Sequence, residues 1–454
     1  MASKWNNILF SKVDISTLAF FRVAFALLML ISTLRYWANG WVYSQLIAPK
    51  HYFHYFGFEW IKPLPEFGIH LVYLFMVLSI TGIMLGYFYR FSAALFFLLF
   101  TYTELIDITN YLNHYYFISL VALMMIFVPA NRSFSLDVLR KPKIKLDKVP
   151  RWTIEIIRFQ LAIVYFYAGI AKINPDWLFD AMPMSIWLQG KSHWPILGSL
   201  FTEQWVAYGL SWAGCIYDLS IPFLLYNSKT RRFGFVLVVV FHVFTRMLFP
   251  IGMFPFIMIT ATLIFFSSDW HRRILVKIQS FLKPISANLD LIPEKDDKIA
   301  RRKGQKFISS LIFIFFALQL IFPFRYICYP GKLFWTEQGY RYSWRVMLME
   351  KVGTAFFYVQ NKDSDKKFEV NNHDFLTPQQ EKMMATQPDL ILQYAKIIEE
   401  SVSKKGWKDP KITADIYVTL NGKRSKQFID PSIDLTELND GFEHKTWILP
   451  FENE

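Results

Sequence analysis

Cysteine is nearly absent from this chain, which has only Cys215 and Cys328 among its 454 residues. Cys215 lies inside an apolar segment and Cys328 lies just beyond another, so their expected depths differ and no disulfide bond is predicted. The chain also lacks a Gly-rich phosphate loop, a Gly-x-Ser-x-Gly turn and a His-Glu-x-x-His run. These absences argue against nucleotide, esterase and zinc-protease chemistry, and no metal site is predicted.

Charged residues are scarce as well, at 19% of the chain, whereas 54% of the residues are hydrophobic and 19% are aromatic. This apolar content exceeds that of a soluble domain, so the composition predicts an integral membrane protein embedded in a lipid bilayer. A helix needs about 20 mostly apolar residues to cross the hydrocarbon core. Nine segments are candidates: Ile15–Trp37, His70–Tyr87, Phe91–Leu105, Tyr115–Pro129, Thr153–Lys172, Trp205–Tyr226, Phe233–Leu248, Ile251–Phe266 and Phe307–Phe324.

The net charge of +13 is explained by the loops between these segments. Lysine and arginine gather in the loops Asn131–Arg151, Asn227–Arg232 and Ser267–Lys306, and basic loops stay in the cytoplasm. With nine spans, the N-terminus and all three loops are then cytoplasmic, and the chain after Phe324 is extracytoplasmic. Nucleic-acid binding is not predicted, because the charges are scattered on short loops rather than gathered on one folded face.

The residue pattern changes after Phe324, where charged and apolar residues begin to alternate and turn signals appear. This change predicts a second domain. The predicted architecture is therefore an integral membrane all-α bundle of about nine transmembrane helices over residues 1–324, followed by a small extracytoplasmic mixed β domain over residues 325–454. The elements expected in this domain are strands at Trp344–Glu350 and Thr354–Gln360 around a turn at 351–353, a helix N-cap at Thr377, a helix at Pro388–Ser403, and a hairpin with its turn at Asn421-Gly422.

Lys172 is the most informative single residue, because it lies at the outer end of an apolar span. An ammonium in or beside hydrocarbon is costly, and desolvation favours the neutral amine, which is a usable base. Lys172 is thus a candidate catalytic base for a lipid-soluble substrate. The alternative is a lysine that extends its charge to the lipid headgroups and has no chemical role.

The other polar residues within the spans sort into two sets. Toward the cytoplasm lie Arg22, Glu155, Arg158 and Asp218, which we interpret as a structural set whose charges neutralise one another. Toward the outside lie Glu104, Asp107, Asn113, His114, Lys172, His242 and Arg246. A lone histidine is usually a core residue, but bases and acids from four spans at one depth predict an active-site chamber open to the outer face.

Several motifs in this order also carry a family resemblance. They are the run from Tyr165 to Trp177 (YFYAGIAKINPDW), the Asn113-His114 pair, the stretch from Phe241 to Phe254, the segment from Trp335 to Met347 (WTEQGYRYSWRVM), and the C-terminal pieces Leu376–Gln380, Met384–Asp389 and Ile429–Pro431. Together they resemble the vitamin K-dependent γ-glutamyl carboxylase family over nearly the whole chain. Ala171 stands where the animal enzymes have a further lysine, and the sequence is more similar to compact bacterial members.

The resemblance implies an enzyme, a carbon–carbon lyase that carboxylates glutamate in a peptide or protein substrate. In the family, a lysine matched by Lys172 deprotonates vitamin K hydroquinone, dioxygen adds, and the strongly basic product removes the γ-proton of glutamate. The carbanion then takes up carbon dioxide, and the quinone leaves as its epoxide. A histidine matched by His114 is associated with carboxylation, and the quinol of a bacterial member is menaquinol or a related naphthoquinol.

The same motifs supply further candidates for binding the substrate or the quinone, namely Asn113, Tyr167, His242, Arg246, Met253, Trp344 and Arg345. A γ-proton is too weakly acidic for a side-chain base, so its removal demands a stronger base in a water-excluded site. Two alternatives stay open. One is a quinol epoxidase that never carboxylates a protein, and the other is a non-enzymatic membrane protein of the same fold.

Overall fold

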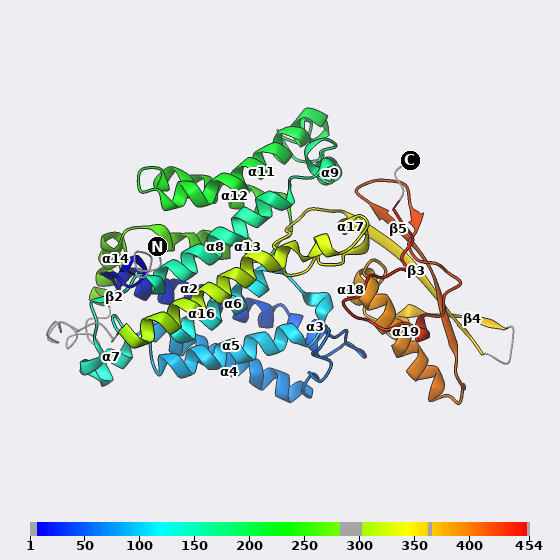
Figure 1. The fold of residues 1–454 in the computed structure, drawn as a ribbon, viewed down its shortest axis with the longest axis horizontal. Coiled ribbons are helices and arrows are strands. Elements are labelled where there is room, and N and C mark those ends of the chain that lie inside the picture. Colours follow the sequence, from blue (N-terminus) through cyan, green and yellow to red (C-terminus); the bar gives the residue numbers. More distant parts are fainter. Residues whose placement is uncertain (1–6, 282–301, 362–365, 452–454) are drawn as a thin grey trace.

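The protein is described by a computed structural model over residues 7–281, 302–361 and 366–451 (Figure 1). Helices fill the first part of the chain, and a four-stranded sheet with two helices beside it forms the second. The helices of the first part are α2 (Ser16–Ala38), α3 (Trp41–Leu46), α4 (Glu66–Leu85), α5 (Tyr89–Leu105), α6 (Asn113–Phe127), α7 (Leu136–Arg140), α8 (Trp152–Ala171), α9 (Pro175–Leu178), α10 (Met184–Gln189), α11 (Gln204–Tyr226), α12 (Arg231–Leu248), α13 (Phe254–Thr262), α14 (Ser268–Phe281) and α16 (Arg302–Ile321).

Each apolar segment singled out in the sequence falls on one of these helices. By length and composition, four helices in the described ranges are suited to crossing a membrane: Ser16–Ala38, Glu66–Leu85, Trp152–Ala171 and Gly304–Cys328. Two shorter helices, Asn113–Phe127 and Phe254–Phe265, are apolar as well. The helical membrane architecture is therefore confirmed, and the crossing of a bilayer by all nine segments stays a prediction.

The segments expected to be cytoplasmic lie at one end of the bundle. Strand β1 (Lys12–Asp14) pairs antiparallel with β2 (Lys148–Pro150), which joins the N-terminal segment to the first basic loop. The side chain of Arg272 on α14 lies 3.8 Å from Asp14 and brings the start of the third basic loop to the same place. The part of that loop at 282–301 lies outside the described residues.

The cytoplasmic polar set is not the single neutral cluster that we expected. Glu155 and Arg158 do form an ion pair, at 3.1 Å. The guanidinium of Arg22 instead donates a hydrogen bond to the carbonyl oxygen of Phe134, at 2.5 Å. Asp218 does not belong to this set at all, because it pairs with Lys172.

The second part of the chain contains a four-stranded antiparallel sheet in the order β4-β3-β5-β6. Its strands are β3 (Lys351–Gln360), β4 (Lys367–Val370), β5 (Lys411–Leu420) and β6 (Lys426–Gln427), and its helices are α17 (Leu333–Thr336), α18 (Pro378–Met384) and α19 (Pro388–Ser403). Buried residues of the sheet and of α19 share one apolar core with Trp177 and Leu178, which follow α8. The two parts are thus packed together by a continuous core.

Several predicted elements of this part are confirmed. The helix Pro388–Ser403 has the expected bounds, and the Thr377 hydroxyl accepts from the backbone of Gln380 in a capping box. Asn421 and Gly422 both have positive φ, at 51° and 72°, as an Asn-Gly hairpin turn requires. The strand predicted at Trp344–Glu350 and the turn at 351–353 are wrong, because β3 already begins at Lys351.

The segment 344–350 stays irregular because its polar and aromatic groups are used by neighbours from distant parts of the chain. The Trp344 ring stacks on Tyr116 of α6, with centroids 4.8 Å apart. Glu350 exchanges two backbone hydrogen bonds with Asn421, one to its side chain and one to its main chain. These contacts direct the segment along the helical part instead of into the sheet.

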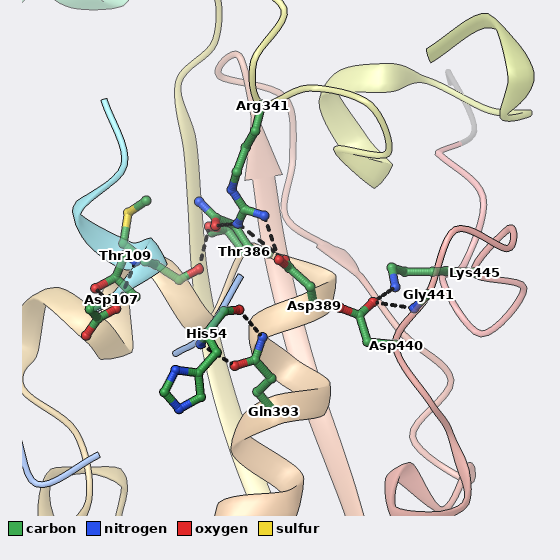
Figure 2. Close-up of polar contacts among 12 residues, drawn as sticks. His54, Asp107, Thr109, Arg341, Thr386, Asp389, Gln393, Asp440, Gly441 and Lys445 are labelled. Atoms are coloured by element: carbon green, nitrogen blue, oxygen red, sulfur yellow. Dashed lines mark hydrogen bonds and ion pairs between the residues drawn. The ribbon is translucent and has the colours of Figure 1, made fainter. Parts of the chain in front are cut away.

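Polar contacts fasten the second part onto the helical part at several places. The amide of Gln380 donates to Asp107 at 2.7 Å. Gln393 exchanges two hydrogen bonds with the backbone of His54 (Figure 2). At a further place the amide of Asn421 donates to Asp176 at 2.7 Å, and the ammonium of Lys332 lies 3.0 Å from the same carboxylate. The hairpin turn is therefore a docking element.

Replacing Asn421 by alanine tests this docking contact. The variant loses two side-chain hydrogen bonds, one of them to a buried carboxylate, and it places alanine at a positive φ that asparagine tolerates better, so we expect it to lose about 2–3 kcal/mol of stability. Thermal unfolding of the purified protein in detergent measures the loss. Asn439→Ala is the control, because Asn439 is exposed and its side chain accepts an exposed hydrogen bond from Lys396. Equal unfolding temperatures for the two variants would refute the docking role.

Candidate functional site

Lys172 is buried, with a relative exposure of 6%, directly after the last residue of α8. Its ammonium donates to the Asp218 carboxylate at 2.7 Å and to the carbonyl oxygen of Ala168 at 3.3 Å, and it lies 5.4 Å from the centre of the Trp177 ring. The interpretation of this residue as a lysine extended to the headgroups is therefore wrong. Its charge is met by a carboxylate inside the protein.

Contrary to the prediction from the sequence, Asp218 does not lie toward the cytoplasm. The first turns of α11 pack on the segment after α8, since the Trp177 indole donates to the carbonyl of Ser211 and the Trp212 indole donates to that of Leu178. Because α11 starts farther out, Asp218 in its second half comes level with Lys172.

An apolar cavity of about 490 Å³ lies beside this ion pair, between α8, α11, α12 and α13. Besides Lys172 and Asp218, its polar lining includes Tyr165 and His242, whose hydroxyl oxygen and Nε2 are 3.0 Å apart. The Nδ1 atom of His242 is buried and has no hydrogen-bond partner among the described residues. The hydroxyl of Tyr217, which lines the same cavity, is likewise buried without a partner in the described part of the chain, so the cavity offers a ligand two hydrogen-bonding groups in mostly apolar surroundings.

One wall of the apolar cavity reaches the outer surface of the bundle. Ile216 of α11 and Val240 of α12 line the cavity and are 58% and 59% exposed. An exposed aliphatic surface on membrane helices is suited to contact with lipid tails. The cavity is thus adjacent to the region from which a lipid-soluble molecule would arrive.

A second, more polar cavity of about 580 Å³ lies where the helical part meets the second part. Asn113, His114 and Met253 line it from the helical part, and Arg345 lines it from the second part. The amide of Asn113 donates to the Arg345 carbonyl at 2.8 Å, and the Tyr111 hydroxyl accepts from the backbone of Tyr342 at 2.8 Å. These bonds hold the two sides of the polar cavity in register.

The two cavities share a wall made of Ile251, Phe254, Val346 and Met347. The Phe254 ring is 5.6 Å from the imidazole of His114 in the polar cavity and 5.6 Å from that of His242 in the apolar cavity. The sequence predicted that the outer polar residues form one chamber, and this prediction is wrong. They are divided between two adjoining cavities, with Lys172 in one and His114 in the other.

Three of the predicted binding residues line neither cavity. Tyr167 donates to the carbonyl of Leu320, Trp344 packs on Tyr116, and Arg246 is exposed on α12. Glu104 and Asp107 do not line the cavities either, and Asp107 serves in docking Gln380. We leave these five residues out of the proposed chemistry.

Other residues of the site were not singled out from the sequence, although two of them left a signal. Tyr165 precedes Lys172 by seven residues, a spacing that puts both on one face of a helix. Arg35 is a basic residue near the outer end of a span, where the charge rule does not favour one, and it lines the polar cavity. Nothing in the local sequence marks Phe254 as the wall between the cavities.

Both parts of the chain match models of known families. Residues 10–270 match the HTTM domain, which makes the helical part a member of that class of membrane protein. Residues 304–454 match the lumenal domain of vitamin K-dependent gamma-carboxylase. With both matches in this order, the chain belongs to the vitamin K-dependent γ-carboxylase family, as the resemblance predicted. No solved structure matches the chain.

The buried Lys172–Asp218 pair predicts a specific pattern of stability. Removing one partner leaves an uncompensated buried charge, so Lys172→Met and Asp218→Leu should each cost about 3–5 kcal/mol. The double variant should recover much of this loss, because two apolar side chains of similar size replace the pair.

Thermal unfolding of the two single variants and the double variant measures this coupling. Losses that simply add in the double variant would mean that the two groups do not interact. Ser220→Ala on the same helix is the control, since its hydroxyl donates a local hydrogen bond to the Tyr217 carbonyl and is not part of the ion pair.

Proposed function

We propose that this protein is an enzyme that couples oxidation of a vitamin K-type hydroquinone to γ-carboxylation of glutamate in a peptide or protein, with one half of the reaction in each cavity. The observation that carries the proposal is the common wall at Phe254, which separates the Lys172–Asp218 cavity from the His114 cavity by one aromatic ring. Membership of the γ-carboxylase family supports it.

The apolar cavity suits a naphthoquinol such as menaquinol. It is lined mostly by apolar groups, it adjoins the lipid-facing surface, and the unpaired Nδ1 of His242 is placed to bond a ring oxygen. When bound and oxygenated by dioxygen, the hydroquinone supplies a base strong enough for a γ-proton and leaves as its epoxide. The surrounding apolar side chains exclude the water that would quench such a base.

Lys172 and Asp218 act together as the acceptor of the hydroquinone proton. As an ammonium and a carboxylate, the pair can accept one more proton, which gives an ammonium and a carboxylic acid. When the proton held within the pair moves to Asp218, the Lys172 amine is free to take a proton from the bound hydroxyl. Asp218 thereby gives a lysine that is held as an ion pair the capacity to act as a base.

The polar cavity receives the glutamate side chain of the substrate. Proton transfer needs contact with the base, so in this proposal the side chain reaches past the Phe254 ring to the oxygenated hydroquinone. The γ-proton passes to that base, and the electron pair left on the γ-carbon forms the new bond to carbon dioxide. His114 lies on the substrate side of this wall, with its ring 5.6 Å from Phe254. It is placed to hydrogen-bond the carboxylate or the incoming carbon dioxide, and Asn113 beside it fixes the start of α6.

The protein works in this proposal as a nine-span membrane protein with residues 1–324 in the bundle and residues 325–454 outside. The basic loops support a cytoplasmic N-terminus, and the lumenal-domain match supports an extracytoplasmic second part. Peptide substrates then reach the polar cavity from the outer side, while the quinol reaches the apolar cavity from the bilayer.

Substitutions at Lys172 and His114 test the division of labour between the cavities. Purified protein is incubated with reduced vitamin K, labelled bicarbonate and a Glu-rich peptide, and epoxide and γ-carboxyglutamate are measured separately. Lys172→Ala and Lys172→Arg should both lose epoxide formation, by at least about a hundredfold, because a guanidinium keeps its proton. His114→Ala should lower carboxylation more than epoxide formation.

Arg246→Gln is the matched control for charge on a membrane helix, since Arg246 is exposed and lines neither cavity. Full epoxide formation by Lys172→Arg would refute the base assignment. Epoxide formation by the wild type without any γ-carboxyglutamate would favour the alternative of a quinol epoxidase.

Single cysteines test the proposed topology. Cys328 is exposed and is first replaced by serine, whereas the buried Cys215 is kept. Lys143→Cys and Arg424→Cys then place one thiol on the first basic loop and one on the second part, and both positions are exposed. A membrane-impermeant maleimide applied from the outer side should label the thiol at position 424, and one applied from the cytoplasmic side should label the thiol at position 143. Labelling of both from the same side would refute the nine-span arrangement.

A further inference from the structure

Four charged side chains line the polar cavity: Arg35, Glu337, Arg341 and Arg345. Two of them are already neutralised by partners that do not line the cavity. The guanidinium of Arg341 makes a two-point contact with Asp389 of α19, as Figure 2 shows, and Glu337 lies 2.9 Å from the ammonium of Lys351. Arg341 in turn holds the pKa of Asp389 below its usual range, although burial opposes this shift.

Arg345 has no carboxylate partner among the described residues. It is only 8% exposed, its guanidinium lies 4.4 Å from the centre of the Tyr326 ring, and its Nε atom is buried without a hydrogen-bond partner in the same part of the chain. The titratable groups that face it are the phenols of Tyr326 and Tyr340, and burial lowers its pKa. A buried guanidinium without a carboxylate partner is costly, so binding of an anionic ligand beside it is favoured.

Arg35 is the second unpaired cation of the polar cavity. It lies in the last turn of α2, and its guanidinium is 4.7 Å from the centre of the Trp41 ring, which lines the same cavity. No carboxylate lies within ion-pair distance of it in residues 7–281, 302–361 and 366–451. Glu66 on α4 and Glu104 on α5 are acidic groups of the neighbouring helices, and neither lines the cavity.

We propose that Arg35 and Arg345 form a dicarboxylate-binding site in the polar cavity, which holds the malonyl-type side chain present after carboxylation. Two guanidinium groups from distant parts of the chain then face two carboxylates. The identity of the natural ligand rests on the proposed function, whereas the preference for a dianion rests on the charges of the cavity alone.

The change of charge during the reaction explains why two unpaired cations suit this site. The glutamate side chain carries one negative charge when it binds, and it carries two once the γ-proton has left and also after carbon dioxide has added. Groups that bind the doubly charged side chain more strongly than the singly charged one lower the barrier to its formation. Arg35 and Arg345 are therefore expected to lower the cost of proton removal and to retain the product.

Malonate is the probe for this site, because it reproduces the two carboxylates of the product and needs no turnover. Isothermal titration calorimetry of the full-length protein in detergent should detect malonate binding, with acetate binding at least about tenfold more weakly. Arg35→Gln and Arg345→Gln should each weaken malonate binding by about tenfold or more. Arg345→Lys should keep part of it, because charge is retained without the two-point geometry.

Arg424→Gln is the matched control, since it removes the same charge from an exposed position on the second part. Equal affinities for acetate and malonate, no malonate binding by the wild type, or full binding in both glutamine variants would each overturn the site. If Arg345→Gln does not fold, Arg35→Gln, which alters the helical part of the lining, decides the question.

The same proteins separate this inference from the proposed function. Wild-type protein that binds malonate but never forms γ-carboxyglutamate would refute the proposed function and leave the dicarboxylate site standing. Protein that carboxylates the peptide, but whose malonate binding is unaffected by both glutamine variants, would refute the site alone.

Discussion

The ion pair between Lys172 and Asp218 is the interaction on which the rest of the site depends. A lone ammonium at this depth would be too costly to keep, and a lone carboxylate equally so, whereas the two in contact at 2.7 Å form a neutral unit. That neutrality lets titratable groups remain in an apolar cavity beside the lipid. It also fixes the relative height of α8 and α11, and so the position of the apolar cavity that α12 and α13 complete.

The second part of the chain completes the site as well as covering it. Arg345 contributes to the polar cavity, and Val346 and Met347 contribute to the wall that both cavities share. The bond from Asn113 to the Arg345 carbonyl and the contacts of Gln380, Gln393 and Asn421 hold this part in place. Docking of the sheet-bearing part and construction of the reaction site are thus the same event.

The sequence predicts the fold well where a local pattern decides it. Apolar runs locate the membrane helices, and proline and threonine at 377–378 locate the start of α18. The pattern fails at 344–350, where contacts with α6 and with Asn421 override an apparent strand. It fails again at Asp218, because the depth of a residue within a helix depends on where neighbouring helices begin, and no single-helix pattern records that offset.

The wall at Phe254 is built half from each part of the chain, so the two cavities are separated only when both parts are packed together. Phe254 and Ile251 come from the helical part, and Val346 and Met347 come from the second part. In the proposed reaction, loss of the latter pair would open the apolar cavity to the polar one, so water could reach the oxygenated hydroquinone. The proposed oxidation would then be protected from water only when the second part of the chain is packed in place.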